Sequence, residues 1–241
     1  MSPPPASRIL LVTGASQGIG RAAALALAET GAHVIAAARS QKALTKLDDD
    51  ILARTGRNAT LLPLDLRDGP AIDALASALL QRFGRLDGLL ANAGVLGPLG
   101  PLQMATPQAF AETMEVNFAA NWRLIRALDP LLRASEAGRV VFVTSGAAVR
   151  PRAFWGPYAA SKAALEAMAL CYADEVEQLA LRVNLFDPGP TRTQMRFKAM
   201  PGEDRSKLPT PEEVAAALPP LLSADCTLHG QRVSFRNPQS G

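Results

Sequence analysis

The sequence predicts a single α/β domain built on a doubly wound parallel sheet with helices on both faces. Short apolar runs alternate with helical patterns along all 241 residues, and aromatic residues make up only 5% of the chain. That composition suits helices packed on aliphatic parallel strands, and a chain of this length can bury one large core. We therefore expect residues 1–241 to form one domain. The segments with the character of strands, about seven in all, are 9–13, 33–38, 59–63, 88–91, 139–144, 181–186 and 231–235.

The first strand leads into a glycine-rich turn, Thr13-Gly-Ala-Ser-Gln-Gly-Ile-Gly20, followed by an Ala/Leu-rich helix that ends before Gly31. Glycines 14, 18 and 20 allow a sharp turn and let the backbone approach a pyrophosphate at the helix N-terminus. The spacing is G-x-x-x-G-x-G rather than G-x-G-x-x-G. A turn with a purely structural role is the alternative interpretation.

Helix-start signals support the alternation later in the chain. Thr106-Pro107 supplies an N-cap and a proline at the first helical position, which predicts a long helix to Ala134. Thr210-Pro211-Glu212-Glu213 is a capping box, which predicts a helix to about Leu222. Residues 190–209 form a long irregular segment after a strand. Because ligands bind at the carboxyl ends of strands in such sheets, we expect a substrate loop there.

Composition excludes several classes of protein. The net charge of +3 comes from scattered Lys and Arg residues, which predicts neither a nucleic-acid nor a membrane partner. Apolar runs stay below the ~18 residues of a membrane span. Residues 1–7 lack a signal-peptide pattern and are expected to be a disordered tail. Cys171 and Cys226 are isolated, as in reduced, packed thiols of a cytoplasmic protein.

Ser145, Tyr158 and Lys162 have the spacing of a proton-transfer site. Ser145 follows the strand 139–144, and Tyr158 and Lys162 lie four residues apart on one face of the next helix. A neighbouring ammonium favours an ionised phenol, and lowering a phenol pKa from ~10 by roughly 2 to 3 units takes about 3 to 4 kcal/mol. Tyr158 would exchange a proton with a substrate oxygen that Ser145 also binds. Neither residue accepts a hydride, so this chemistry requires a redox cofactor.

Together these motifs resemble the short-chain dehydrogenases/reductases over nearly the whole chain. The matching motifs are Thr13–Gly20, Asn92-Ala-Gly94, Asn117, Ser145, Tyr158-x-x-x-Lys162 and Pro188-Gly189. The segments 152–158, 182–184, 191–196 and 203–211 resemble the YciK-type branch of uncharacterised bacterial oxidoreductases. The resemblance implies a Rossmann-like fold and an NADP(H)-dependent oxidoreductase that transfers a hydride between nicotinamide and a carbonyl or secondary alcohol. It also implies a homodimer or homotetramer.

The resemblance assigns roles to individual residues. Tyr158 is the general acid/base, Ser145 orients the substrate oxygen, and Lys162 lowers the Tyr158 pKa and holds the ribose. Asn117, in a bent helix, holds water for a proton relay to Lys162. The expected cofactor-binding residues are Gly14, Ser16, Gln17, Gly18, Ile19, Gly20, Arg39, Ser40, Asp65, Leu66, Asn92, Ala93, Gly94, Tyr158, Lys162, Pro188, Gly189, Thr191 and Thr193.

The end of the second strand indicates which cofactor is used. Ala38 stands where an NAD enzyme carries an acid for the ribose hydroxyls, and Arg39 can pair with a 2′-phosphate. We therefore expect NADP(H) to be preferred over NAD(H), with help from Ser40. Gln17 replaces the Arg or Lys of many NADP-preferring relatives. The alternative is that Arg39 is only solvated or stacks on the adenine.

Other functions fit the sequence less well. A serine hydrolase would need a histidine and a G-x-S-x-G elbow near Ser145, and no His/Cys cluster suggests a metal site. A methyltransferase would need an acid at the end of the second strand. A catalytically silent NADP(H)-sensing protein would be expected to lack Tyr158 or Lys162, which this chain retains.

Three features remain open. Asp187 departs from the family pattern before Pro-Gly and either repels anionic substrates or points outward. The aromatic and Met side chains near the site form either an apolar substrate pocket or the packing of an interface or lid: Phe154, Trp155, Phe197 and Met200. Apolar residues on the helix after Tyr158 suggest a surface for self-association: Leu165, Met168, Ala169 and Tyr172.

Overall fold

A computed structural model describes residues 7–236 of the protein. The expected N-terminal tail lies outside the described residues except for Ser7, whose hydroxyl donates to the Gly31 carbonyl at 2.7 Å. Within the described range, no helix combines the length and apolar character needed to cross a membrane.

Seven parallel strands form one sheet in the order β3-β2-β1-β4-β5-β6-β7. The predicted strands are confirmed, each end to within one residue. Their bounds are β1 Ile9–Thr13, β2 His33–Ala38, β3 Thr60–Pro63, β4 Gly88–Ala91, β5 Gly138–Val143, β6 Leu181–Asp187 and β7 Arg232–Ser234. The chain runs outward from β1 to β3, then returns to place β4 against the other side of β1. A doubly wound sheet has its ligand crevice at this reversal, beyond the carboxyl ends of β1 and β4.

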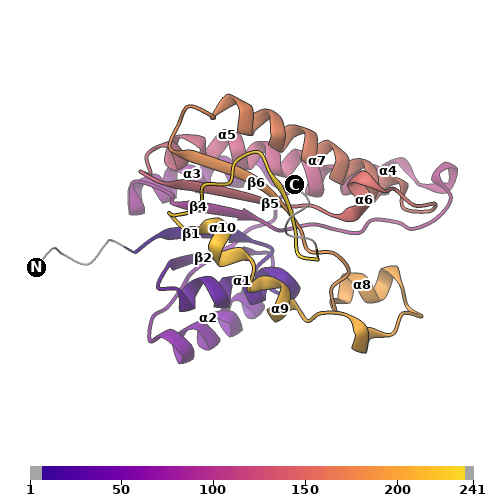
Figure 1. Ribbon diagram of the computed structural model, residues 1–241, viewed down its shortest axis with the longest axis horizontal. Coiled ribbons are helices and arrows are strands. Elements are labelled where there is room, and N and C mark those ends of the chain that lie inside the picture. The colour runs from indigo at the N-terminus through magenta and orange to yellow at the C-terminus, as the bar shows by residue number, and fades with distance from the viewer. Residues whose placement is uncertain (1–6, 237–241) are drawn as a thin grey trace, which may run out of the picture.

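Helices cover both faces of the sheet (Figure 1). One layer holds α1 Gly18–Glu29, α2 Gln41–Thr55, α9 Pro211–Ala215 and α10 Leu218–Leu222. The other holds α3 Gly69–Phe83, α4 Pro107–Met114, α5 Ala120–Arg133 and α7 Gly156–Glu175. Each layer encloses its own apolar cluster, with Phe142 buried in one and Phe186 in the other. Burial on both faces explains why the strands are continuous apolar runs.

Two predicted helices are interrupted. The helix expected from Pro107 to Ala134 contains a π-helical segment, Glu115–Ala119, between α4 and α5. The capping box at Thr210 is present, but the helix after it divides into α9 and α10. Pro219 and Pro220 have no N–H to donate to the preceding turn, so the ladder of hydrogen bonds breaks there.

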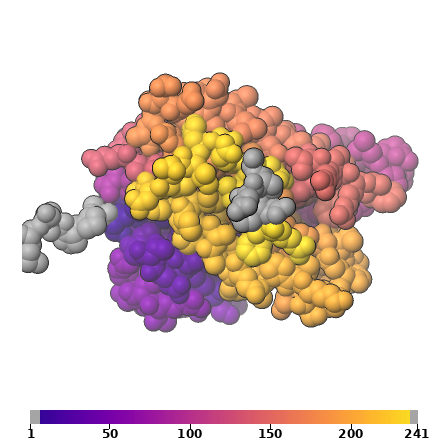
Figure 2. Space-filling view, viewed as in Figure 1, coloured from indigo at the N-terminus to yellow at the C-terminus, as the bar shows by residue number. Residues whose placement is uncertain are grey.

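The segment 190–209 is more ordered than the sequence suggested. It contains the short helix α8, Gln194–Ala199, capped by Thr193, whose hydroxyl accepts from the Arg196 amide at 3.1 Å. Arg196 pairs with Glu203 through two hydrogen bonds of 2.5 and 2.6 Å. Figure 2 shows this segment in light orange beside the C-terminal part of the chain, which is yellow and lies across the face in view.

Candidate active site

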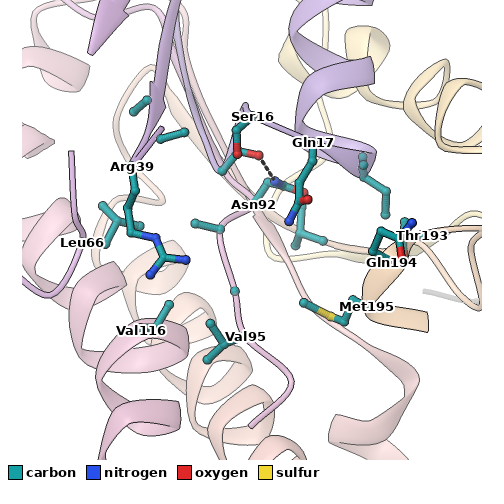
Figure 3. A pocket seen from close by; sticks show the side chains of 18 of the residues that line it. Ser16, Gln17, Arg39, Leu66, Asn92, Val95, Val116, Thr193, Gln194 and Met195 are labelled. Atoms are coloured by element: carbon teal, nitrogen blue, oxygen red, sulfur yellow. Dashed lines mark hydrogen bonds between the residues drawn. The ribbon is translucent and has the colours of Figure 1, made fainter. Parts of the chain in front are cut away.

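A pocket of about 270 Å³ lies at the carboxyl ends of the strands where the chain order reverses. It is lined by most of the expected cofactor residues: Gly14, Ser16, Gln17, Gly18, Ile19, Arg39, Asp65, Leu66, Asn92, Ala93, Gly94, Tyr158, Lys162, Pro188 and Thr193. In Figure 3, Arg39 and Leu66 lie on one side of the pocket, and Thr193, Gln194 and Met195 lie on the other. Gly20, Ser40, Gly189 and Thr191 do not line it.

The glycine-rich turn forms a close-packed wall of this pocket. Gly14 and Gly18 have φ values of +66° and +56°, which favour glycine. A Cβ at Gly20 would collide with the Asn92 side chain and with the Gly14 carbonyl. The hydroxyl of Thr13 accepts from the Asn92 amide at 3.0 Å, and the Asn92 side chain donates to the Thr13 carbonyl at 3.0 Å. Strand β4 therefore holds the turn in place.

This geometry suits a pyrophosphate. Helix α1 begins at Gly18, directly after the turn, and has no acidic residue in its first turn. Its free N–H groups and helix dipole favour an anion beside the turn. The glycines leave the space next to the backbone free of side chains. The residues present thus fit the phosphates of a dinucleotide.

The end of β2 provides a separate basic position. The Arg39 side chain is exposed at the pocket wall and forms no salt bridge with any residue between 7 and 236. Ser40 has another role, because its hydroxyl caps α2 by accepting from the Ala43 amide at 3.3 Å. Asp65 pairs with Arg67 at 2.6 Å, and this pairing keeps the pKa of Asp65 below its usual range.

Tyr158 and Ser145 lie together beside the pocket. Tyr158 is buried in the first turns of α7, and the ring of Trp155 contacts it edge-on at 5.9 Å between centroids. Burial raises the pKa of Tyr158, hydrogen bonding with the Ser145 hydroxyl lowers it, and the charge of Asp187 raises it further. The net effect is a raised pKa. The phenol is therefore protonated at neutral pH.

Lys162 lies one helical turn beyond Tyr158, as the spacing predicted, but its ammonium donates to the Val143 carbonyl at 2.8 Å. Complete burial lowers the pKa of Lys162 to about 8. The expected lowering of the Tyr158 pKa by Lys162 is not found, since Lys162 is not among the groups that shift the pKa of Tyr158. The physical reason is that burial of the phenol outweighs its hydrogen bond with Ser145, and the charge of Asp187 acts in the same direction as burial.

Asn117 lies in the π-helical segment and is fully buried. Its side chain accepts from the Val95 amide at 2.8 Å and donates to the Val95 carbonyl and the Ser161 hydroxyl, both at 2.9 Å. The Asn117 carbonyl accepts from the Asn121 side chain at 2.9 Å. The helix is irregular at Asn117, as expected, and the observed bonds hold the backbone at Val95, next to Gly94, in place.

Asp187 is buried, so the expectation that it points outward was wrong. Its Oδ1 accepts from the Gly189 amide at 3.0 Å, and its Oδ2 accepts from Arg232 at 2.8 Å. Among the aromatic candidates, Trp155 packs beside Tyr158, whereas the Phe154 and Phe197 side chains are 60% and 43% exposed. Only the tertiary packing distinguishes these roles.

Several contributing residues were not predicted. Additional residues line the pocket: Ala37, Ala38, Leu64, Val95, Glu112, Val116, Val143, Thr144, Gln194 and Met195. Thr13 and Ser161 support Asn92 and Asn117 through hydrogen bonds. Thr13 opens the glycine-rich turn and Ser161 lies within the Tyr-x-x-x-Lys motif, so membership of these motifs could have pointed to both residues. No sequence motif could have pointed to Arg232, which lies far along the chain from the other site residues.

The buried ammonium of Lys162 predicts a pH dependence of stability. Below pH 8 Lys162 is charged in both the folded and unfolded states, and folding carries the cost of burying that charge. Between pH 8 and 10.5 the folded protein releases the proton while the unfolded chain keeps it, so stability rises with pH. A pKa lowered from 10.5 to about 8 corresponds to about 3 kcal/mol.

We therefore expect the unfolding free energy of the native protein, minus that of Lys162→Met, to rise by about 3 kcal/mol from pH 8 to 10.5. Urea denaturation at several pH values measures this difference. Lys46→Met, at an exposed position on α2, is the control and should show no such rise. A pH-independent difference for Lys162→Met would contradict the lowered pKa.

Comparison with known proteins agrees with the fold and with the motifs around the pocket. The short chain dehydrogenase family matches residues 8–204. The uncharacterized oxidoreductase YciK of Escherichia coli (strain K12) is 45% identical over 209 residues, covering 86% of this chain and 82% of YciK. An uncharacterized NAD-dependent oxidoreductase of Mycobacterium tuberculosis (strain CDC 1551 / Oshkosh) is 34% identical, covering 78% of this chain and 73% of its own length.

Solved structures show the same similarity. A protein of this family from Escherichia coli CFT073, whose crystal structure is complexed with NADPH, is 42% identical with a TM-score of 0.91. That match covers 94% of this chain and 95% of the other. With the Rossmann-like sheet, the glycine-rich turn and the Tyr158 and Lys162 pair in place, the chain belongs to the short chain dehydrogenase family of oxidoreductases.

Proposed function

We propose that the protein is an NADP(H)-dependent oxidoreductase that interconverts a carbonyl compound and a secondary alcohol, with Tyr158 as the general acid/base. The observation that carries this proposal is the position of the Tyr158 phenol, beside Ser145 and at the wall of a pocket suited to a dinucleotide. When bound, NADP(H) supplies or accepts the hydride.

The residues of the chain handle the proton. In the direction of reduction, the protonated phenol of Tyr158 donates to the carbonyl oxygen, and the Ser145 hydroxyl orients that oxygen. Lys162 holds the ribose and, with a pKa of about 8, exchanges a proton near neutral pH. Asn117 holds the backbone of Val95 through two hydrogen bonds, and thereby holds the pocket wall beside Lys162 in place. The turn at Gly14–Gly20 binds the phosphates, and Arg39 binds the 2′-phosphate.

A screen of NADPH consumption tests the proposal. The panel should contain ketones, quinones, sugars and 3-oxoacyl thioesters, each with NADPH and then with NADH. Reduction of at least one carbonyl class is expected. Tight NADPH binding without turnover on any member of the panel would instead support a catalytically silent, NADP(H)-sensing protein of the same fold.

We also propose that the protein is a homodimer or homotetramer. Contrary to expectation, Leu165, Ala169 and Tyr172 are buried in the core of the subunit. On α5 and α7 the exposed large apolar residues are instead Trp122 and Leu170, at 48% and 44% exposure. Light scattering at micromolar concentration should give a multiple of 25.4 kDa. A particle of single-chain mass would contradict this.

A further inference from the structure

Arg232, on the edge strand β7, reaches from the edge of the sheet to the back of the candidate active site. Its Nε donates to Glu166 at 3.0 Å, and its Nη2 donates to Asp187 at 2.8 Å and to the Ser145 carbonyl at 3.3 Å. The side chain is 24% exposed, and those of Glu166 and Asp187 are 13% and 10% exposed. A largely buried guanidinium thus has two carboxylate partners and one backbone partner.

The two carboxylates extend these contacts to other parts of the site. Glu166 lies one turn beyond Lys162 on α7 and accepts from the Thr144 hydroxyl at 2.6 Å. Asp187 accepts from the Gly189 amide at 3.0 Å, and this hydrogen bond closes the turn after β6. Arg232 therefore connects the backbone that presents Ser145 with the turn at Pro188–Gly189.

The contacts of Arg232 with Glu166 and Asp187 also affect the charge close to Tyr158. Asp187 raises the pKa of Tyr158, because a nearby carboxylate opposes ionisation of the phenol. Arg232 is the cation paired directly with that carboxylate. Removing a partner from such a buried pair leaves an uncompensated charge, which is costly and tends to rearrange its surroundings.

We propose that Arg232 is a positioning residue that locks the main chain of Ser145 to the Pro188–Gly189 turn, with Glu166 and Asp187 as its acidic anchors. This inference rests on the proposed function, since it assigns Ser145 and the turn to one reacting geometry. Small displacements of reacting groups cost about 10- to 100-fold in rate. The expected loss is therefore in turnover rather than in substrate affinity.

Hydrogen exchange at two backbone amides can measure the positioning effect of Arg232 directly, without any substrate. The Ala148 amide donates to the same Ser145 carbonyl that Arg232 binds, at 3.0 Å. The Gly189 amide donates to the Asp187 carboxylate. In Arg232→Gln, which is too short and uncharged to span the three contacts, hydrogen exchange at both amides should be about 10-fold faster or more.

The experiment compares Arg232→Gln with Arg54→Gln, a control that removes an exposed arginine paired with Glu29 at 2.9 Å. Exchange should accelerate at residues 148 and 189 but not in α3, and only in Arg232→Gln. On the first carbonyl compound reduced in the NADPH screen, kcat should fall about 10-fold with KM within about 3-fold. Unchanged exchange at both amides, or acceleration spread evenly over the chain, would overturn the proposal.

Two further variants allow the role of Arg232 to be tested even if Arg232→Gln does not fold, and separate it from the proposed function. If Arg232→Gln does not fold, Arg232→Lys keeps the charge but cannot form the forked contacts, and it should show the same localised exchange to a smaller degree. Tyr158→Phe separates the two hypotheses. If Tyr158→Phe stays active, the proposed function fails; if it is inactive while Arg232→Gln keeps its kcat, only the role of Arg232 fails.

Discussion

Tyr158→Phe should reduce turnover by about 100-fold or more while leaving NADPH affinity nearly unchanged, which is the usual scale for loss of a general acid. The phenol lies at the pocket wall and hydrogen-bonds with Ser145, and the substitution removes one oxygen without changing the ring. The contact with Trp155 is retained, so packing should persist. Steady-state kinetics on a substrate from the screen, together with an NADPH titration, measure both quantities.

The chain contains a matched control, because Tyr172 is its only other tyrosine and lies on the same helix. The Tyr172 hydroxyl donates to Asp129 at 2.8 Å and does not line the pocket. Tyr172→Phe should therefore keep kcat near the native value while losing a partly buried hydrogen bond to a carboxylate, worth about 1.5 to 3 kcal/mol of stability. Equal kinetics for Tyr158→Phe and Tyr172→Phe would reject Tyr158 as the acid.

Arg39→Ala should weaken NADPH binding by about 10- to 100-fold and leave NADH binding nearly unchanged. A charge-assisted hydrogen bond to the 2′-phosphate is worth about 1.5 to 3 kcal/mol, and NADH has no such phosphate. Arg39 is available for this contact because it lines the pocket without a salt bridge to any residue in the described part of the chain. Fluorescence titration of both cofactors measures the change.

Arg57→Ala is the control for net charge. Arg57 donates to the Gly31 carbonyl at 3.0 Å and does not line the cofactor pocket, so its loss should leave the affinity ratio intact. Similar native affinities for NADPH and NADH, or an unchanged ratio in Arg39→Ala, would show that Arg39 does not select the cofactor. The family supports either outcome, since an NADPH complex and a protein named NAD-dependent both occur among the relatives.

The sequence determined the features of this protein that depend on local pattern. Apolar period and turn residues placed each strand end to within one residue, and the spacing of the glycines predicted the turn that lines the pocket. The i, i+4 spacing of Tyr158 and Lys162 predicted that both side chains lie on one face of the helix, and both line the pocket. These signals are local because backbone dihedrals and helical periodicity are set within a few residues.

The tertiary structure alone decided what these side chains contact. Asn117 bonds to a backbone segment 22 residues away, and Arg232 reaches Ser145 across 87 residues. Burial raises the pKa of Tyr158 although its motif suggested the opposite. Contacts at such separations depend on how the layers pack, and desolvation depends on everything that surrounds a group. Neither the packing nor the desolvation is encoded in the short-range pattern of the chain.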